Sequence, residues 1–451
     1  MNRDLTQGGI TGGLLRFALP MIAGNLLQQA YNVTDTLIVG QLLGADALAA
    51  VGSSYTLMTF LTSILLGLCM GSGVLFSICR GEGNYKRLRS CVAVSFAMIG
   101  AAAVALSLAV FLALDPILRF LQAPAAVYGL MRDYLWRVFW GIGATFLYNF
   151  FASLLRAVGN SAVPLLFLAV SAVGNIALDL FFVLVLGWGV SGAAVATALA
   201  QWVSGVGIAL YTLRRFPELC PAREELRWDG NNAREILRLS SLTCLQQSVM
   251  NFGILLVQGR VNSFGPAVMA AFAAAVKIDS FAYMPVQDFG NAFSTFIAQN
   301  FGARQYDRIR RGVRSAAGCA AAFCMVSSAA VCVFARPLLR LFVKAGETEI
   351  LAVGVRYLRI EGAFYIGIGI LFLLYGLYRA VGRPGMSVVL TVVSLGTRVV
   401  LAYALSAVPA VGVTGIWVSV PIGWFLADAA GILYYVRNRA SLLGESGAAN
   451  D

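Results

Sequence analysis

Long uncharged apolar runs recur along the whole chain and constrain its fold more than any other feature. Many are about 20 residues or longer, the length that an α-helix needs to cross the hydrocarbon core of a bilayer. The chain is 59% hydrophobic and only 12% charged, and its mean hydropathy is +0.80. This composition excludes a soluble globular protein and predicts an all-α, polytopic membrane protein.

Charged residues and Gly/Pro-containing turns divide the chain into twelve predicted spans. The N-terminal part of the chain carries Arg3, Asp4 and Arg16, and the first apolar segment is too long for the core of a signal peptide, so we expect it to stay in the membrane. The predicted spans are residues 14–41, 46–79, 91–114, 130–156, 163–186, 191–213, 236–262, 267–300, 312–335, 353–379, 386–407 and 413–436. The predicted organisation is an N-terminal lobe (1–213), a cytoplasmic linker (214–235), a C-terminal lobe (236–440) and a polar tail (441–451).

The positions of the basic residues are more informative than the net charge of +12. Lys and Arg fall mainly in alternate short loops, which is the positive-inside pattern of membrane proteins rather than a patch for nucleic acid. The basic clusters lie at residues 80–89, 214–234, 304–314 and 437–439. This pattern predicts that these loops and both termini are cytoplasmic, that lipid surrounds the chain, and that nucleic acid is not a partner.

Three short motifs recur in the same order, which indicates that the two halves are repeats. Each repeat contains six spans, an even number, so both halves enter the membrane from the same side. An axis along the membrane normal should relate them, with a cavity between them. We interpret the motifs themselves as loop geometry and lobe packing. The pairs are GEGNYKRLR (81–89) with GARQYDRIR (302–310), RAVG (156–159) with RAVG (379–382), and GVSG (189–192) with GVTG (412–415).

The first span, PMIAGNLLQQAYNVTDTLIVGQ, places a carboxylate inside the membrane. Its polar residues recur at three- and four-residue steps, so they form a stripe on one helix face that should line a cavity. A charge at the centre of a membrane helix costs roughly 2.5 to 3.5 kcal/mol on insertion scales, so Asp35 is a candidate functional residue. The stripe consists of Asn25, Gln28, Gln29, Asn32, Asp35 and Thr36.

The fifth and sixth spans add Asn175, Asp179 and Thr197, the first two on one helix face. At about 1.5 Å per residue, Asp179 lies roughly 24 Å along an outward-running helix and Thr197 roughly 9 Å along an inward-running one. Both therefore reach the outer half of the membrane, as does Asp35. Two carboxylates, an amide and a hydroxyl are oxygen ligands for a hard cation such as Na⁺, and they equally suit a site that traps a proton.

The second half lacks this set of residues and so provides an internal control. Acids that only held a fold common to both halves would occur in both. We therefore expect a coupling-ion site confined to the first lobe, rather than packed structural acids. At the offsets of the repeats, Asp35, Asn175, Asp179 and Thr197 correspond to Gly253, Arg398, Ala402 and Val420.

Other intramembrane polar residues are candidates for a substrate cavity. The alternative is a structural role, in which Lys277 and Asp279, for example, neutralise each other. Tyr and Met side chains suit contacts to an apolar cation, with helix packing as their alternative role. The candidates are Gln28, Tyr31, Asn32, Asp279, Tyr283, Met284, Asp288, Asn291 and Arg398, with Lys277, Glu361 and Asp428 as further charges of the second half.

Several kinds of chemistry are not expected from this composition. The sequence contains no histidine, which removes Ser-His-Asp catalysis and HExxH zinc sites, and it has no GxxxxGK[ST] loop for ATP. Its eight cysteines lie mostly in apolar segments without CxxC spacing, so we interpret them as small core residues rather than disulfides or metal ligands. An enzyme is therefore not expected.

Together these motifs resemble those of the multidrug and toxic compound extrusion (MATE) transporters. The resemblance covers essentially all twelve spans and includes RAVGN, and GNIALDLFF followed by GVSGAAVATALA. It implies two six-helix lobes arranged as a V, and export of small organic cations, dyes and drugs in exchange for Na⁺ or H⁺, with no other cofactor. In the bacterial and archaeal branch, the first-lobe cation-binding residues match Asp35, Asn175, Asp179 and Thr197.

The resemblance also implies that Pro20 bends the first helix as the state of Asp35 changes. Another branch places an acid in the seventh span for a second-lobe cation site, but residues 236–262 carry no acid, so a second-lobe sodium site is not expected. The expected protein is a monomeric secondary exporter of the bacterial cytoplasmic membrane that works by alternating access. The alternative is a lipid or lipid-linked oligosaccharide flippase of the same superfamily, for which a mainly basic cavity is expected.

Overall fold

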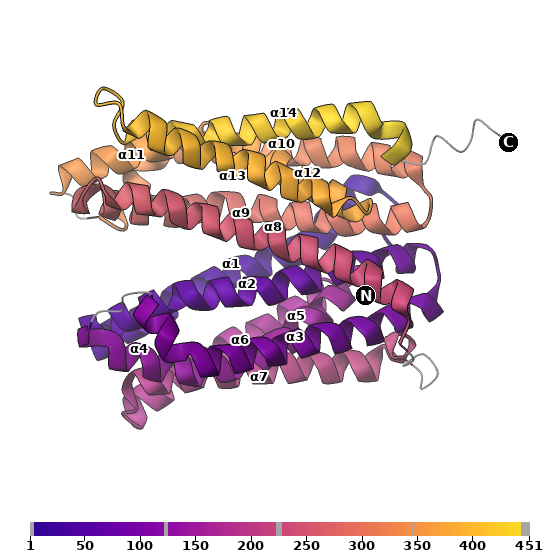
Figure 1. Ribbon diagram of the computed structural model, residues 1–451, viewed down its shortest axis with the longest axis horizontal. Helices are drawn as coiled ribbons and strands as arrows, with labels where there is room; N and C mark the ends of the chain where they lie inside the picture. The colour runs from indigo at the N-terminus through magenta and orange to yellow at the C-terminus, as the bar shows by residue number, and fades with distance from the viewer. Residues whose placement is uncertain (1–3, 121–124, 222–227, 344–345, 443–451) are drawn as a thin grey trace. The chain divides into compact units, whose positions relative to one another are not determined.

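The computed structural model describes residues 4–120, 125–221, 228–343 and 346–442, and it gives the backbone alone for residues 36, 37, 40, 41, 45, 48, 49, 53, 55, 56, 120, 125, 126 and 255. Every regular element within the described residues is helical (Figure 1). The helices are α1 (Ile10–Leu43), α2 (Ala45–Gly81), α3 (Tyr85–Phe120), α4 (Ala125–Val138), η1 (Phe139–Gly141), α5 (Ile142–Ala157), α6 (Ala162–Leu180), η2 (Phe181–Val185), α7 (Gly189–Arg215), η3 (Pro217–Leu219), α8 (Gly230–Asn262), α9 (Pro266–Gly302), α10 (Tyr306–Arg340), α11 (Thr348–Gly362), α12 (Tyr365–Ala380), α13 (Pro384–Ser406) and α14 (Thr414–Leu442).

Ten of the described helical segments are long and apolar enough to cross a membrane, or eleven when α11 and α12, bent by 51°, count as one span. The one predicted span that is missing from this set is the seventh, 236–262, which lies in α8. This helix is long enough at 33 residues. Its polar residues, including Arg234, Glu235, Gln246 and Gln247, keep its mean hydropathy low. The all-α membrane fold is thus confirmed, and α8 is the span that apolarity alone does not identify.

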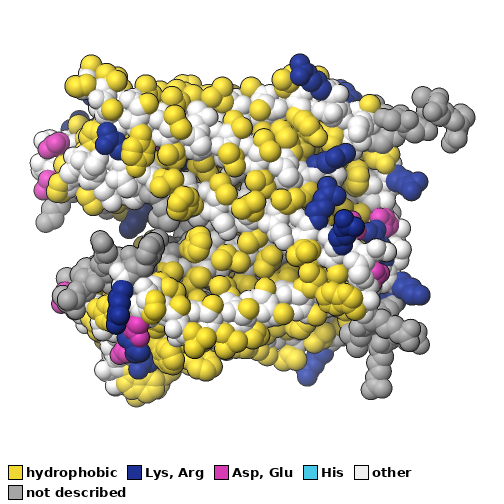
Figure 2. Space-filling view, in the orientation of Figure 1, with side chains coloured by type: hydrophobic (Ala, Val, Ile, Leu, Met, Phe, Trp, Pro, Cys, Tyr) yellow, Lys and Arg dark blue, Asp and Glu magenta, His cyan; other side chains and the backbone are white. Residues whose placement is uncertain are grey.

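The surface of the helices agrees with a membrane protein. Figure 2 shows hydrophobic side chains covering the lengths of the helices, with most Lys, Arg, Asp and Glu side chains near the helix ends. Large apolar residues are exposed along several helices, including Leu112, Val173 and Val326. Such a surface is unfavourable in water and suited to lipid tails.

The chain forms two compact units whose boundaries differ from the predicted lobes. Unit 1 is built from Ala23–Cys244, and unit 2 from Leu5–Ile22 together with the chain from Leu245. Helices α1 and α8 are therefore divided between the units, α1 after Ile22 and α8 after Cys244. A boundary placed in the polar linker at 214–235 misses this division, because a long helix can pack against one set of helices at one end and another set at the other.

The repeated motifs adopt matching turns in the two units. Gly159 and Gly382, each the last residue of an RAVG motif, have φ values of 86° and 73°. In the GEGNYKRLR and GARQYDRIR motifs, Gly83 (φ 68°) corresponds to Arg304 (φ 54°). This left-handed conformation ends a helix and turns the chain, and it usually requires glycine. The structure thus supports the interpretation of these motifs as loop geometry.

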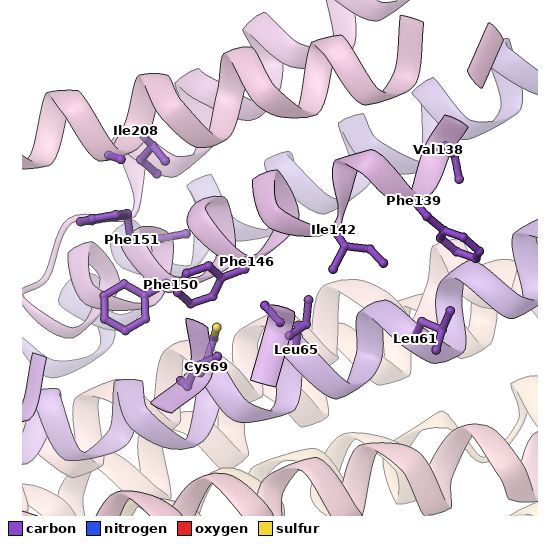
Figure 3. Packing of buried hydrophobic residues seen from close by; sticks show 14 of the residues in the cluster. Leu61, Leu65, Cys69, Val138, Phe139, Ile142, Phe146, Phe150, Phe151 and Ile208 are labelled. Atoms are coloured by element: carbon purple, nitrogen blue, oxygen red, sulfur yellow. The ribbon is translucent and has the colours of Figure 1, made fainter. Parts of the chain in front are cut away.

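The core of unit 1 is packed by aromatic and small residues from α2, α3 and α5. Figure 3 shows Phe146 and Phe150 of α5 pointing toward Leu65 and Cys69 of α2, whereas Phe151 lies on the other side of α5, toward Ile208 of α7. The rings of Phe146 and Phe150 are 5.8 Å apart, and those of Phe150 and Phe151 are 5.5 Å apart. All eight cysteines are free thiols. Four of them are buried, as predicted for small core residues, and the other four are half-buried. The buried four are Cys69, Cys79, Cys91 and Cys324.

Candidate functional site

Unit 1 brings together two carboxyl groups that are 144 positions apart in the sequence. Asp179 is fully buried near the end of α6, and Asp35 is half-buried on α1. The two side chains are close enough to form a hydrogen bond when they share a proton. Both Asp179 oxygens and Oδ1 of Asp35 are buried without a donor among the described residues. Two such carboxylates repel each other, so the pair requires a shared proton or a bound cation.

Asn175 lies one helical turn before Asp179 on the same face of α6, and Thr197 of α7 is hydrogen-bonded to Asn175. The Asn175 amide Nδ2 donates to Oγ1 of Thr197 over 3.3 Å, and that hydroxyl donates to the Ala193 carbonyl over 3.0 Å. The amide oxygen Oδ1 of Asn175 is buried and has no donor within the described part of the chain. Unit 1 therefore contains a cluster of buried oxygens with unused lone pairs, which is the donor set that Na⁺ or a proton would bind.

The packing of α6 against α7 explains why these residues meet. Ser171 of α6 donates to the Ala200 carbonyl of α7 over 3.0 Å, and Ser204 of α7 donates to the Phe167 carbonyl over 3.2 Å. Just beyond Asp179, the helix widens into the π-helical turn η2, in which the Leu186 amide bonds to the Phe181 carbonyl. Such turns are often found at functional sites. These contacts fix the register that places Asn175 opposite Thr197.

Tyr134 on α4 lies near the carboxyl pair, which the sequence does not indicate. Its side chain is buried and lies within electrostatic range of Asp35, Asp179 and Tyr31. A phenol can donate a hydrogen bond to a carboxylate or accept one from a protonated acid. Tyr134 occurs in an ordinary amphipathic segment, and no spacing within that segment indicates a polar partner on α1 or α6.

The other α1 candidates are less enclosed within unit 1. Gln28 is exposed, whereas Tyr31 and Asn32 are half-buried. Asn32 donates from Nδ2 to Oε1 of Gln29 over 3.4 Å, so neighbouring members of the predicted stripe contact each other. The side chain of Thr36, the last member of the stripe, lies outside the described residues.

Unit 2 contains a second polar cluster, centred on Asp279 of α9. Tyr365 donates to Asp279 Oδ1 over 2.6 Å, and Tyr357 lies 3.4 Å from Oδ2. The Tyr357 hydroxyl also lies 3.0 Å from Oε2 of Glu361, to which it can donate a hydrogen bond. All four side chains are buried, and Glu361 Oε1 has no donor among the described residues.

Aromatic residues and one cation enclose this second cluster. The Tyr357 ring packs edge-on against Trp417 at 4.9 Å and against Phe272 at 5.5 Å. Arg398 lies close enough to Asp279 and Glu361 for their charges to interact. The structure thus brings together Asp279 and Arg398, two of the predicted cavity residues, and adds Tyr357 and Tyr365, which the sequence did not indicate.

The remaining candidates of unit 2 occupy different surroundings. Lys277 is exposed whereas Asp279 is buried, so Arg398, rather than Lys277, faces that carboxylate. Tyr283 lies near Asp279 and stacks on Phe372 at 6.4 Å. Met284 is half-buried, Asp288 is buried, and Asn291 accepts a 3.0 Å hydrogen bond from Nη2 of the buried Arg379. These residues follow one another along α9.

Asp428 of α14 is another buried acid of unit 2. Its side chain is 4% exposed, and neither carboxyl oxygen has a donor among the described residues. It lies near Gly367 and Tyr375 of α12. A carboxyl group in such surroundings is far less costly when it is protonated. Unit 2 therefore holds acids as well, although its sequence lacks the counterparts of Asp35 and Asp179.

Comparisons with known proteins agree on one family. The MatE family model matches residues 20–181 and 240–404, one stretch in each repeat. The probable multidrug resistance protein YpnP of Bacillus subtilis (strain 168) is 30% identical over 438 residues, which are 97% of each chain. A crystal structure of a MATE protein in complex with MaL6 has a TM-score of 0.92 and 23% identity, over 98% of each chain. An outward-facing multidrug resistance MATE transporter has a TM-score of 0.91 and 23% identity, over 97% of this chain and 98% of that chain.

The structural matches show the fold, since their sequence identity is low, and the family match and the relative carry the assignment. Both halves of the chain match one family model, as expected for two repeats of one unit. The matched stretches contain Asp35 and Asp179 in the first half and Asp279 and Glu361 in the second. The chain belongs to the MatE family of multidrug and toxic compound extrusion transporters.

Proposed function

We propose that this protein is a secondary active exporter of small, mostly cationic organic compounds, driven by Na⁺ or H⁺ entering through the Asp35–Asp179 site. The observation that carries the proposal is the buried carboxyl pair of unit 1, whose oxygens lack donors among the described residues. A drug exporter with no ATP-binding loop needs an ion gradient, and such a pair is a place to bind that ion. The multidrug resistance relatives favour this function over a flippase.

The coupling follows from the electrostatics of the pair. An ion that binds between Asp35 and Asp179 relieves their repulsion and stabilises the conformation in which α1 and α6 approach. Release of the ion restores the repulsion and favours the other conformation. Drug export follows when the ion-bound conformation has low affinity for the drug. Both termini are proposed to be cytoplasmic, and the chain is proposed to act as a monomer in a bacterial cytoplasmic membrane.

The test is dye efflux from cells that lack their own pumps. Cells would express the native chain, Asp35→Asn or Asp179→Asn at matched membrane levels, and ethidium efflux would be followed while Na⁺ and pH are varied separately. Asp133→Asn is the control, because Asp133 is an exposed acid of unit 1 that forms a 3.7 Å ion pair with Arg137. We expect efflux by the native chain and the control, and loss of efflux in both site variants.

Each outcome decides a part of the proposal. Efflux that depends on Na⁺ at fixed pH identifies a sodium exchanger, and efflux that depends only on the pH gradient identifies a proton exchanger. If the native chain moves no dye under any gradient, drug export is wrong, and lipid-linked substrates are tested next. If the native chain and both site variants move dye equally, export stands but the coupling site is elsewhere.

A further inference from the structure

The segment before α1 is bound by one arginine of the repeated motif in α10. The Arg308 guanidinium donates to three backbone carbonyls of this segment, those of Leu5, Gln7 and Gly8. Its Nε and Nη2 bond to the Leu5 carbonyl over 3.2 and 3.1 Å, Nη2 bonds to Gln7 over 2.7 Å, and Nη1 bonds to Gly8 over 2.8 Å. A planar guanidinium suits such a forked arrangement, which a lysine cannot reproduce.

Two buried side-chain amides of α9, those of Gln299 and Asn300, bind the same segment at Leu5. The Leu5 amide donates to Oε1 of Gln299 over 3.2 Å, and Nδ2 of Asn300 donates to the Leu5 carbonyl over 3.2 Å. Gln299, Asn300 and Leu5 are all buried. A turn later, the hydroxyls of Thr11 and Ser315 are 2.7 Å apart. The start of α1 is thus fixed to α9 and α10 by several hydrogen bonds.

This attachment explains why α1 is divided between the two units. Leu5–Ile22 belongs to unit 2, whereas the rest of the helix, with Asp35, belongs to unit 1. Pro20 lies inside α1, two residues before the division. Proline removes one backbone hydrogen bond of the helix and is a usual cause of a bend. One helix therefore carries an anchored end, a proline and an ion-binding acid in this order.

The corresponding arginine of unit 1 also contacts the start of a divided helix, but through a carboxylate instead of backbone carbonyls, and it binds Glu82 of its own loop as well. Arg87 occupies in GEGNYKRLR the position of Arg308 in GARQYDRIR. It binds Glu235, near the start of α8, through a 2.6 Å salt bridge. Asn232 of α8 donates to Ser90 of α3 over 3.1 Å. In each repeat, the arginine at this motif position therefore contacts the beginning of a helix that is divided between the units. Arg308 contacts the start of α1, and Arg87 contacts the start of α8.

We propose that Arg308 is a positioning residue for transport, which anchors the first half of α1 to unit 2 throughout the cycle. Residues 5–22 then follow unit 2, and the bend at Pro20 that the family resemblance implies takes place between this anchored segment and Asp35. The transport role rests on the proposed export function, whereas the anchoring itself does not. The anchor converts a local change at Asp35 into movement of a whole unit.

The first test compares Arg308→Ala with Arg311→Ala, whose arginine is exposed on the same helix. Hydrogen exchange would be measured on the purified full-length proteins. In Arg308→Ala we expect faster exchange in residues 5–22 and unchanged exchange in residues 23–35, whereas Arg311→Ala should match the native chain. Unchanged exchange in residues 5–22 would overturn the anchor, whether or not the protein exports dyes.

The second test replaces the hydrogen-bonded anchor by a covalent one. Thr11→Cys and Ser315→Cys would be combined, in the native chain and in Arg308→Ala, with each single cysteine variant as a control for the natural thiols. Arg308→Ala is expected to lower ethidium efflux about tenfold, the factor that corresponds to one charge-assisted hydrogen bond. Oxidation of the cysteine pair should restore it, and reduction should remove the rescue.

The two remaining outcomes distinguish a permanent anchor from a gate. Oxidation of the pair in the otherwise native chain should leave efflux unchanged, because the proposed anchor never opens. Loss of efflux on oxidation, or normal efflux by Arg308→Ala, would contradict the role in transport. If the native chain moves no dye, the export function fails, and the hydrogen-exchange result alone decides whether Arg308 anchors α1.

Discussion

The hydroxyl of Tyr365 donates a 2.6 Å hydrogen bond to the carboxyl group of Asp279, which lies 86 residues earlier in the chain. Tyr378, on the same helix α12, makes a hydrogen bond of the same length to the Gly431 carbonyl. Both tyrosines are buried. The two bonds therefore differ mainly in their acceptor, which is a carboxyl group in one case and a neutral peptide in the other.

This pair predicts unequal effects of removing a hydroxyl. Hydrogen bonds to charged groups contribute about 1.5–3 kcal/mol, and neutral ones about 0.5–1.5 kcal/mol. We expect Tyr365→Phe to lower the free energy of unfolding by the larger amount and Tyr378→Phe by the smaller. Thermal unfolding of both proteins in the same detergent measures the difference. Equal losses would show that the Asp279 carboxyl is neutral in the folded protein.

Thr197 is expected to contribute to ion binding beyond its structural hydrogen bond. Thr197→Val removes the hydroxyl that accepts a hydrogen bond from Asn175. The variant should need about tenfold more of the coupling ion to activate efflux, because the loss of one ligand worth about 1.4 kcal/mol changes an affinity by that factor. Thr212→Val is the matched control, because Thr212 lies on the same helix, is buried, and donates to the Ile208 carbonyl over 2.7 Å. Equal ion dependence in the two variants would exclude Thr197 from the ion site.

The close approach of α2 and α8 in unit 1 depends on glycine at residue 71. A Cβ atom at Gly71 would lie 2.5 Å from the Ser240 Cα, whereas one at Gly52 of the same helix meets nothing within 4 Å. Overpacking typically costs about 1–3 kcal/mol. Gly71→Ala should therefore lower the melting temperature, and Gly52→Ala should keep or raise it because alanine favours a helix. A stable Gly71→Ala protein would mean that α2 and α8 separate at little cost.

Pro20 is expected to matter for transport more than for stability. Pro20→Ala restores a helical hydrogen bond, so it should raise the melting temperature while it lowers the rate of ethidium efflux. Pro116→Ala is the control, since Pro116 lies inside α3, which is not divided between the units. It should raise stability without changing efflux. Unchanged efflux by Pro20→Ala would count against a bend in α1 as a step of transport.

Much of the fold was predictable because it depends on local properties. Apolar length predicted the membrane helices, and short motifs predicted the repeat, whose equivalent turns have positive φ at Gly159 and Gly382. Helix α8 is the exception among the spans, because its polar residues hide a helix that is long enough to cross a membrane. Local hydropathy measures what a segment would prefer in lipid, and it cannot account for polar residues that face other helices.

Helical periodicity is fixed by the backbone, so the sequence predicted that Asn175 and Asp179 share a face of α6, and counting residues along the spans predicted that Asp35 and Thr197 lie at a similar depth. The contacts themselves come from the tertiary structure. It placed Thr197 and Asp35 against that face, added Tyr134, and joined Asp279 to Tyr357, Glu361 and Tyr365 in unit 2. It also divided α1 between the units through Arg308. Contacts between helices depend on the packing of whole surfaces, whereas periodicity and depth report only the face and the level of the membrane at which a side chain lies.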